Sequence, residues 1–396
     1  MVKKKAIIVV GLGYGDEGKG LTTDYLCLLN KKSIVIRFNG GHQAGHCVVT
    51  KEGRKHIFSN LCAGSYRGVP SFWSSFCTFE PTCFIEEFNQ LEFEPRIFID
   101  KNCPITTHYD VLYNRAIETT RGNLRYGSCG VGFGATIERQ KNPDVSLFFK
   151  DILKPDILQQ KLKLIRAFYR EKVNTETRYD FDSFAHDDED IAFINSIKSI
   201  YKLISMNIVS PVIEEEIFSK TTLWNTFIFE GAQGILLDKD FGKKPHITKS
   251  NTTSKNALTI LSRQNALSFE TEIFYVTRAY QTRHGAGPFR EKDREFELYN
   301  NYQETNKTNE FQGEFRYNYL DINMLNYALR CDIKYSQHIP KNLMITCIDQ
   351  LNNDEIVFIQ NGKKRKLYYK EIKKELICNF KTIKYSFSNC AEFLID

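Results

Sequence analysis

Long hydrophobic runs are missing from this 396-residue chain. No stretch approaches the roughly 18 to 20 apolar residues that span a bilayer. The basic residues 1–5 lead into a short apolar run at 6–10 and then into a glycine loop. That run is too short for the core of a signal peptide and no cleavage site follows it. We therefore expect a cytoplasmic protein, without membrane contact, whose residues 6–10 form a strand.

Paired cysteines are also missing. The 11 cysteines occur singly, and no two have the CxxC spacing of a zinc ribbon. The spacing argues against a disulfide framework and favours free thiols in a reducing compartment. The chain has no internal repeat and no linker rich in Pro, Gly or Ser.

Positive charge is in only slight excess, with a formal net charge of +6. This fits phosphorylated ligands or weak attraction to polyanions and does not choose between them. We interpret the basic run at 363–366 as a solvated loop or strand edge, so nucleic-acid binding ranks last among the possible functions. With 42% hydrophobic and 26% charged residues, the chain has the composition of a globular protein with a sizeable core.

The first 40 residues follow a β–loop–α–β pattern. After the apolar run come glycines, then apolar residues at helical spacing over 21–29, then a second apolar run at 33–38. This order favours a mainly parallel sheet. Further strands are predicted at 97–100, 227–229, 272–276 and 343–346.

These elements predict an α/β protein with a large, mostly parallel central sheet and a P-loop-like first loop. Because strands recur into the C-terminal third, we expect a single domain over 1–396. Residues 155–220 are charged and at helical spacing, so a mainly helical insertion is expected at about 150–220. The acidic run at 187–190 is predicted to be a solvated turn.

The loop at 11–20, G-L-G-Y-G-D-E-G-K-G, satisfies two phosphate-binding templates. Gly13, Gly15 and Gly18 fit the dinucleotide fingerprint G-x-G-x-x-G, whereas Gly13 with Gly18 and Lys19 fits the P-loop, with a glycine in place of its Ser or Thr. Lys19 supplies a charge for phosphate, and no acid follows the second strand to bind a ribose, so a mononucleotide is favoured over NAD. An acid inside the loop suggests a metal ligand or a catalytic base.

A second glycine-rich cluster, N-G-G-H-Q-A-G-H at 39–46, follows the second strand. His42 and His46 are four residues apart, but the glycines disfavour a helix and no third ligand is near, which argues against zinc. Together with the first loop, this cluster resembles the paired opening motifs of adenylosuccinate synthetases. Six further segments resemble motifs of that family in the family's order. They lie at 127–132, 229–238, 248–253, 282–289, 319–321 and 346–349.

The resemblance implies a ligase that phosphorylates the purine O6 of IMP with GTP and then lets the amine of aspartate displace the phosphate. A lactam oxygen is a poor leaving group, and phosphorylation makes it a good one. Asp16 corresponds to the family's base, which removes the N1 proton and also binds Mg²⁺. His46 is expected to stabilise charge between O6 and the phosphoryl group, and Gln233 to orient the purine.

The family motifs also imply ligand sets. The triphosphate set is Gly15, Glu17, Gly18, Lys19, Gly20, Gly45, His46 and Asp349, the last facing guanine. The IMP set is Asp16, Lys19, Asn39, Gln43, Ser128, Cys129, Gln233, Thr248 and His284. The aspartate set is Arg316 and Glu314, and the metal ligands are Asp16 and the Gly45 carbonyl. The resemblance further implies Mg²⁺, GTP (or ATP) as co-substrate and a homodimer.

Departures from the family pattern concern specificity. Cys347 replaces a lysine of the family beside Asp349, the acid expected to face guanine. The preference for GTP over ATP is therefore in doubt. The arginine-rich aspartate loop becomes N-E-F-Q-G-E-F-R-Y-N at 309–318, leaving Arg316 with Glu314 where another arginine is usual. Cys129 and His284 replace a threonine and a valine. Arg139 is the nearest candidate for the arginine that reaches across the family's dimer.

Two alternatives stay open. A divergent phage branch of the family aminates a guanine nucleotide and tends to replace the catalytic Asp by a small residue; the Asp retained here at position 16 favours IMP or dIMP. A catalytically dead nucleotide-binding regulator is the other alternative. A regulator has no need of a proton-transfer set. The presence together of Asp16, Lys19, His46 and Gln233 therefore favours an enzyme.

Overall fold

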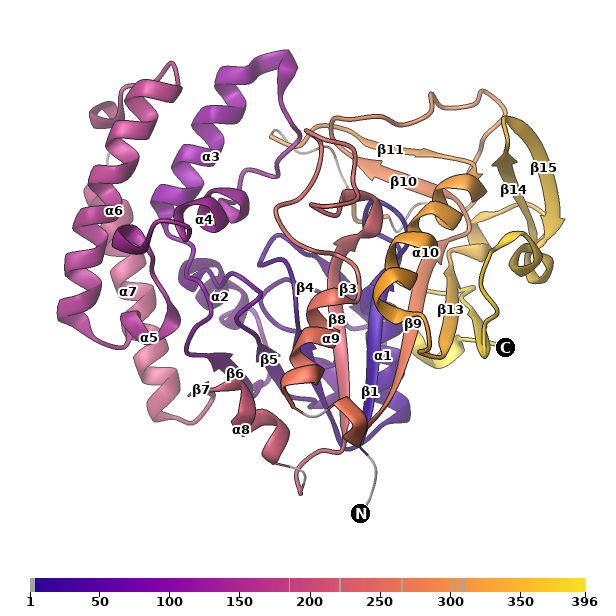
Figure 1. The fold of residues 1–396 in the computed structure, drawn as a ribbon, viewed down its shortest axis with the longest axis horizontal. Coiled ribbons are helices and arrows are strands. Elements are labelled where there is room, and N and C mark those ends of the chain that lie inside the picture. Colours follow the sequence, from indigo (N-terminus) through magenta and orange to yellow (C-terminus); the bar gives the residue numbers. More distant parts are fainter. Residues whose placement is uncertain are drawn as a thin grey trace.

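The computed structural model describes residues 4–184, 186–220, 222–264, 266–300, 302, 304–306, 308 and 311–396. Within this part of the chain, nine strands form one sheet in the order β16-β13-β9-β1-β8-β2-β5-β6-β7, and every neighbouring pair is parallel (Figure 1). The predicted α/β class with a mostly parallel sheet is confirmed. The strands are β1 (Lys4–Gly11), β2 (Ser33–Arg37), β5 (Ser71–Trp73), β6 (Ile97–Asp100), β7 (Val209–Val212), β8 (Thr226–Gly234), β9 (Phe269–Arg278), β13 (Lys341–Thr346) and β16 (Thr382–Tyr385).

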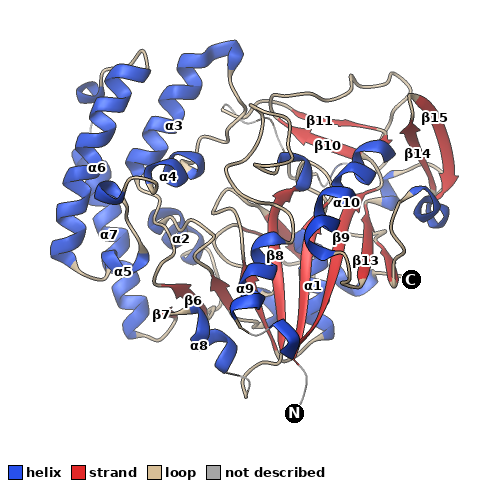
Figure 2. Ribbon diagram, in the orientation of Figure 1, coloured by secondary structure: helices blue, strands red, loops and turns tan. Residues whose placement is uncertain are grey.

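Helices cover both faces of the sheet, as Figure 2 shows. Side chains of β1 alternate between the two faces. Ile8 packs in one core with α9 and α10, and Ile7 packs in another with α1. The helices are α1 (Lys19–Leu29), α2 (Pro81–Phe88), α3 (His108–Arg121), α4 (Phe133–Arg139), α5 (Phe149–Ile152), α6 (Pro155–Glu176), α7 (His186–Ser205), α8 (Glu214–Ser219), α9 (Lys255–Arg263) and α10 (Ile322–Ser336).

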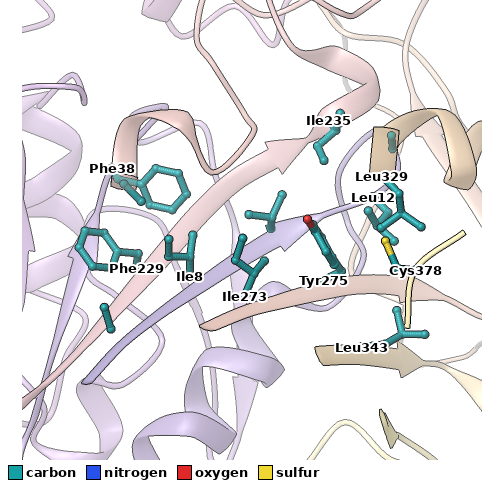
Figure 3. Packing of buried hydrophobic residues seen from close by; sticks show 14 of the residues in the cluster. Ile8, Leu12, Phe38, Phe229, Ile235, Ile273, Tyr275, Leu329, Leu343 and Cys378 are labelled. Atoms are coloured by element: carbon teal, nitrogen blue, oxygen red, sulfur yellow. The ribbon is translucent and has the colours of Figure 1, made fainter. Parts of the chain in front are cut away.

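The larger core lies on the α9–α10 face, where Ile8, Phe229, Ile273 and Tyr275 from adjacent strands belong to one apolar cluster with Leu329 of α10 (Figure 3). Fully burying a large apolar side chain contributes about 1.5–3 kcal/mol each, so these contacts hold the strand ends rigidly in place. The carboxyl ends of parallel strands meet at one edge of the sheet, and in open α/β sheets this edge is the usual place for a ligand.

A helical region lies at one end of the sheet, where α3, α6 and α7 pack around a separate apolar core that includes Ile165 and Phe193 (Figure 1). The predicted turn at 187–190 is wrong, because α7 begins at His186 and three acids lie in its first turn. Carboxylates there interact favourably with the helix dipole. The strand β7 returns from this region to the sheet. The single domain with an insertion at about 150–220 stays a prediction.

Three small sheets complete the fold. They are β3 (His46–Val49) with β4 (Lys55–Phe58), β10 (Gln281–His284) with β11 (Phe315–Asn318), and β12 (Leu320–Asp321) with β14 (Glu355–Gln360) and β15 (Lys363–Tyr368). The basic run is thus a strand edge, as predicted. Lys364 pairs with Glu295 at 2.5 Å and Lys366 with Glu355 at 3.0 Å, so acids offset much of its charge.

All 11 cysteines fall in the described part of the chain and are free thiols, as expected. No helix among the described residues is long and apolar enough to cross a membrane.

Candidate active site

The glycine loop lies between β1 and the start of α1, and two of its glycines are sterically required. Gly18 has φ of 97°, and a Cβ there would come within 2.8 Å of Thr346 Cγ2. A Cβ on Gly20 would lie 2.8 Å from the Cβ of His46. The close approach of β3 therefore leaves no room for the Ser or Thr of a P-loop, and a metal here needs other ligands.

The carboxylate of Glu17 folds back into its own loop. Its Oε1 accepts hydrogen bonds from the amides of Gly13 at 2.9 Å and Gly15 at 2.8 Å, and Oε2 pairs with Lys19. The amides that a dinucleotide fingerprint offers to a pyrophosphate are thus occupied by the protein itself. The first N–H groups of α1, beginning near Gly18, have no acceptors within the helix, so this N-terminus is the better place for a phosphate.

Asp16 is held in a left-handed backbone conformation, with φ of 63°. Its side chain is 26% exposed and lines a cavity. Burial raises the pKa of Asp16, opposed by the nearby charges of His284, Arg278 and Lys19. His284 Nε2 lies 4.0 Å from Asp16 Oδ2. A carboxylate with a raised pKa is a better proton acceptor, which suits a general base.

His46 begins β3 and is buried over a charged pair that the sequence did not single out. Its Nδ1 lies 3.0 Å from Glu230 Oε1, and Glu230 Oε2 lies 3.8 Å from Arg37. Burial lowers the pKa of His46, partly opposed by Glu230. Contact through Nδ1 leaves Nε2 as the ring nitrogen available to a ligand. Glu230 is thus the residue that orients His46.

Several predicted ligands carry buried polar atoms without hydrogen-bond partners in the described structure, and three of them are not histidines. They are Gln233 Oε1, both amide atoms of Gln43 and Thr248 Oγ1. Buried polar groups are normally hydrogen-bonded, so such a group needs an explanation. Gln233 has φ of 62°, and its Cα lies 3.8 Å from where a Cβ on Gly15 would be. Gln233 thus lies beside the glycine loop with a buried amide oxygen that has no hydrogen-bond partner among the described residues.

Other predicted ligands are already engaged. Asn39 links two segments of the chain, because its Nδ2 donates hydrogen bonds to the carbonyls of Ala232 and Asn251, both at 3.1 Å. Ser128 Oγ donates to Asn114 at 2.9 Å. Burial raises the pKa of Cys129 to about 11, so this thiol is neutral.

A cavity of about 430 Å³ opens beside the α1 N-terminus and includes Asp16 and Gly18 on its wall. Asp349, predicted to contact the base of the triphosphate, also lines it, and burial raises its pKa. Cys347, with φ of 61°, is a neighbour on the wall. Residues 386–389 line the cavity too, although no motif in the C-terminal segment indicated a role.

The predicted amino-acid site lies on the β10–β11 hairpin. Arg316 lies opposite Arg283 on the neighbouring strand. Arg283 was not among the predicted ligands. Arg316 Nη2 donates to the carbonyls of Gly285 and of Gly287, the latter at 3.1 Å. Glu314 is exposed. In the loop at 309–318, residues 309 and 310 lie outside the described residues.

The expectation for Arg139 changes. Arg139 is fully buried, and its Nε donates to Asp110 at 2.9 Å, so it is not free to reach across a dimer. The described residues contain no group of three or more His, Cys, Asp or Glu placed to hold a metal, and the argument against zinc at His42 and His46 stays a prediction.

Comparison with known proteins accounts for this arrangement. The family model for adenylosuccinate synthetase matches residues 8–375. The enzyme named adenylosuccinate synthetase from Thermoplasma acidophilum is 32% identical over 83% of this chain and 73% of its own length. Its counterpart from Neisseria gonorrhoeae is 31% identical over 73% of this chain. The match spans 65% of that relative and 64% of the one from Tolumonas auensis.

Two solved structures share the fold. The fully ligated adenylosuccinate synthetase of Plasmodium falciparum superposes with a TM-score of 0.75 at 18% identity, covering 98% of this chain and 99% of that one. The succinoaminodeoxyadenylate synthetase of cyanophage S-2L, bound to dGMP and dATP, superposes with a TM-score of 0.65 at 14% identity over 99% and 95%. The family model together with the Thermoplasma relative decides the assignment: this chain is a member of the adenylosuccinate synthetase family.

Proposed function

We propose that this chain joins L-aspartate to C6 of IMP, using GTP and Mg²⁺, to give adenylosuccinate. The observation that carries the proposal is the meeting of three groups at the N-terminus of α1. Asp16 there has a raised pKa, His46 is oriented by Glu230, and Gln233 has an unpartnered amide oxygen. A protein that only binds nucleotide has no use for a proton acceptor in that position.

In the first step Asp16 removes the proton from N1 of the purine, so that negative charge reaches O6. O6 then attacks the γ-phosphorus of the triphosphate, the bond from that phosphorus to the β–γ bridging oxygen breaks, and the nucleoside diphosphate leaves. Lys19 and the first amides of α1 hold the phosphates. His46 in its protonated form, which Glu230 at Nδ1 favours, donates from Nε2 to the oxygen on which charge develops. Gln233 holds the purine edge in line. In the second step the amine of aspartate attacks C6 and phosphate leaves.

The residues present fit a magnesium ion. Mg²⁺ prefers oxygen ligands and usually takes only one or two from the protein, with phosphate oxygens and waters completing the shell. The carboxylate of Asp16 lines the cavity, and Gly45 is exposed just before β3. When bound, Mg²⁺ would offset the negative charge of the transferring phosphoryl group.

Specificity and assembly belong to the same proposal. Asp349 in the cavity wall can accept the N–H groups of a guanine ring, which supports GTP, whereas Cys347 removes a cationic wall and leaves ATP as a competitor. Thr248 and the loop of Ser128 and Cys129 would receive the 5′-phosphate. Family membership supports a homodimer working in the cytoplasm.

The test is product mass and phosphate release by purified protein with Mg²⁺ and aspartate. The assay crosses IMP, dIMP, GMP and dGMP with GTP, ATP and dATP. We expect a succinyl adduct on IMP with GTP. An adduct only on a guanine nucleotide would assign the chain to the chemistry named for the cyanophage protein. Nucleotide binding without an adduct in any combination would instead support a regulator.

A further inference from the structure

Arg278 at the end of β9 is a buried cation to which no role has been assigned above. It is 8% exposed and lines the same cavity as Asp16 and Asp349. Its Nε donates a hydrogen bond of 2.5 Å to the main-chain carbonyl of Asp16. A charged donor makes this a strong bond, and it falls on the residue proposed as the base.

The carbonyls of two consecutive loop residues are held in this way. Thr346 Oγ1, at the end of β13, donates to the carbonyl of Glu17 at 2.7 Å. In a trans peptide the N–H points opposite to the C=O. Holding the carbonyls of Asp16 and Glu17 against β9 and β13 therefore turns the following amides the other way. It also secures the left-handed backbone of Asp16, a conformation that persists in a non-glycine residue only when its surroundings impose it.

The other end of the guanidinium reaches the wall of the nucleotide cavity. Arg278 Nη1 donates to Glu304 Oε2 at 2.6 Å and to the hydroxyl of Tyr280. That hydroxyl in turn donates to Gln350. Glu304 and Gln350 both line the cavity. One side chain thus bridges the backbone of the base and the wall facing the triphosphate.

We propose that Arg278 is a positioning residue that couples the triphosphate cavity to the orientation of Asp16. The proposal rests on the proposed function for its kinetic part. Glu304 offsets the charge of Arg278 and occupies one of its donors. An incoming triphosphate is therefore repelled by Glu304 and attracted by Arg278, and substitutions of these two residues must shift triphosphate affinity in opposite directions.

The experiment compares Arg278→Met, Arg278→Lys and Glu304→Gln with the wild type. Binding of IMP and of a non-hydrolysable GTP analogue is measured by calorimetry, turnover by phosphate release, and folding by thermal denaturation. Arg365→Met is the matched control, because Arg365 lies on the exposed strand β15, where it pairs with Glu375. We expect the control to match the wild type in every readout.

Arg278→Met is expected to lower kcat by about 100-fold, the upper range for removing a group that orients a catalytic ligand, and to leave IMP affinity within about twofold. Arg278→Lys keeps one donor and should recover about tenfold of that loss. The analogue should bind about threefold more weakly to Arg278→Met and about threefold more tightly to Glu304→Gln, the scale of a single partly screened charge.

A kcat within threefold of the wild type in Arg278→Met, or the same direction of analogue affinity in both variants, would overturn the proposal. If Arg278→Met does not fold, Arg278→Lys and Glu304→Gln decide it: kcat of Arg278→Lys should lie about tenfold below the wild type, and the analogue should bind about threefold more tightly to Glu304→Gln. Should the wild type form no adduct, the proposed function fails, whereas the calorimetric comparison still tests the coupling.

Discussion

The site has two halves that differ in how their side chains are held. Lys19 begins a buried helix and His46 begins β3, whereas Asp16 lies in the loop before α1, where Arg278 of the central sheet holds its carbonyl. Arg316 lies on the two-stranded β10–β11 sheet, and Glu314 lies in the connection just before β11. The chemistry is thus placed on the scaffold, and the proposed amino-acid recognition on its periphery.

The halves differ also in what their polar groups already contact. Gln233 and Gln43 have buried amide atoms without partners among the described residues, so a ligand costs them no existing bond. Arg316 Nη2 already donates hydrogen bonds to two main-chain carbonyls. A carboxylate at this arginine has to replace those bonds, which lowers the net gain from binding. The half proposed for phosphoryl transfer is thus pre-organised, whereas the half proposed for the amino acid has to rearrange.

The largest effect on turnover is expected from Asp16→Asn, in the half proposed for phosphoryl transfer. We expect turnover to fall by about 10³-fold or more, in the range that general bases supply, with nucleotide affinity nearly unchanged. Asparagine tolerates a left-handed backbone, so the loop should keep its shape. Phosphate release and calorimetric affinity are the measurements. Near-normal turnover would remove Asp16 from its role as base.

The next effect is expected from Glu230→Gln beneath His46. Glutamine keeps the shape but not the charge opposite Nδ1, so His46 loses its orienting partner and kcat should fall about 10- to 100-fold. The affinities for nucleotide and aspartate should not change. The matched control is Glu80→Gln at the start of α2, a buried acid whose contacts are to amides of that helix. Equal losses of kcat in both variants would contradict a specific role for Glu230.

On the peripheral half, Arg316→Ala should raise the KM for aspartate by about tenfold and leave the KM values of both nucleotides unchanged. This is the lower range for a charge-assisted hydrogen bond, since the existing carbonyl bonds reduce its net value. Glu314→Gln, just before the same strand, is the matched variant. It should lower the KM for aspartate about twofold, because it removes a negative charge that repels the aspartate carboxylates. A change confined to a nucleotide KM would place aspartate elsewhere.

The smallest effect concerns stability without ligands. Because burial raises the pKa of Asp16 above its usual value of 3.8, the ionised carboxylate destabilises the folded protein above that raised pKa. The destabilisation is absent below the ordinary pKa, where Asp16 is protonated in both states. Asp16→Asn should therefore raise Tm by about 2–4 °C at pH 7, equivalent to roughly 1 kcal/mol in a protein of this size, and not near pH 3.5. Thermal scans without Mg²⁺ measure this, and an equal gain at both pH values would contradict it.

Local pattern was sufficient to predict the central strands and the first loop. The apolar run at 6–10 became β1, and the helical spacing over 21–29 became α1. Buried parallel strands are continuous apolar runs and glycines mark close approaches, so both leave a signal in a few neighbouring residues. The acidic run at 187–190 shows the limit of local signals, because its charge favoured a helix start as well as a solvated turn.

Contacts between distant segments left no such signal. Residues 386–389 reach the cavity because β16 pairs with β13, and the Ser386 amide donates to the Ile345 carbonyl at 2.9 Å. Arg139 could be proposed for a dimer contact only because the sequence does not show that Asp110 neutralises it inside the fold.

Apolar periodicity and short motifs in a particular order were enough to predict the class of fold and the family, and the same motifs supplied the candidate reactive side chains. Only the tertiary structure decided which partners those side chains have. Glu17 turned into the amides of its own loop, Glu230 lies under His46, and Arg278 binds the Asp16 carbonyl. The physical reason is that burial and charge pairing are properties of the packed chain, because they depend on which residues far apart in sequence come to exclude water together.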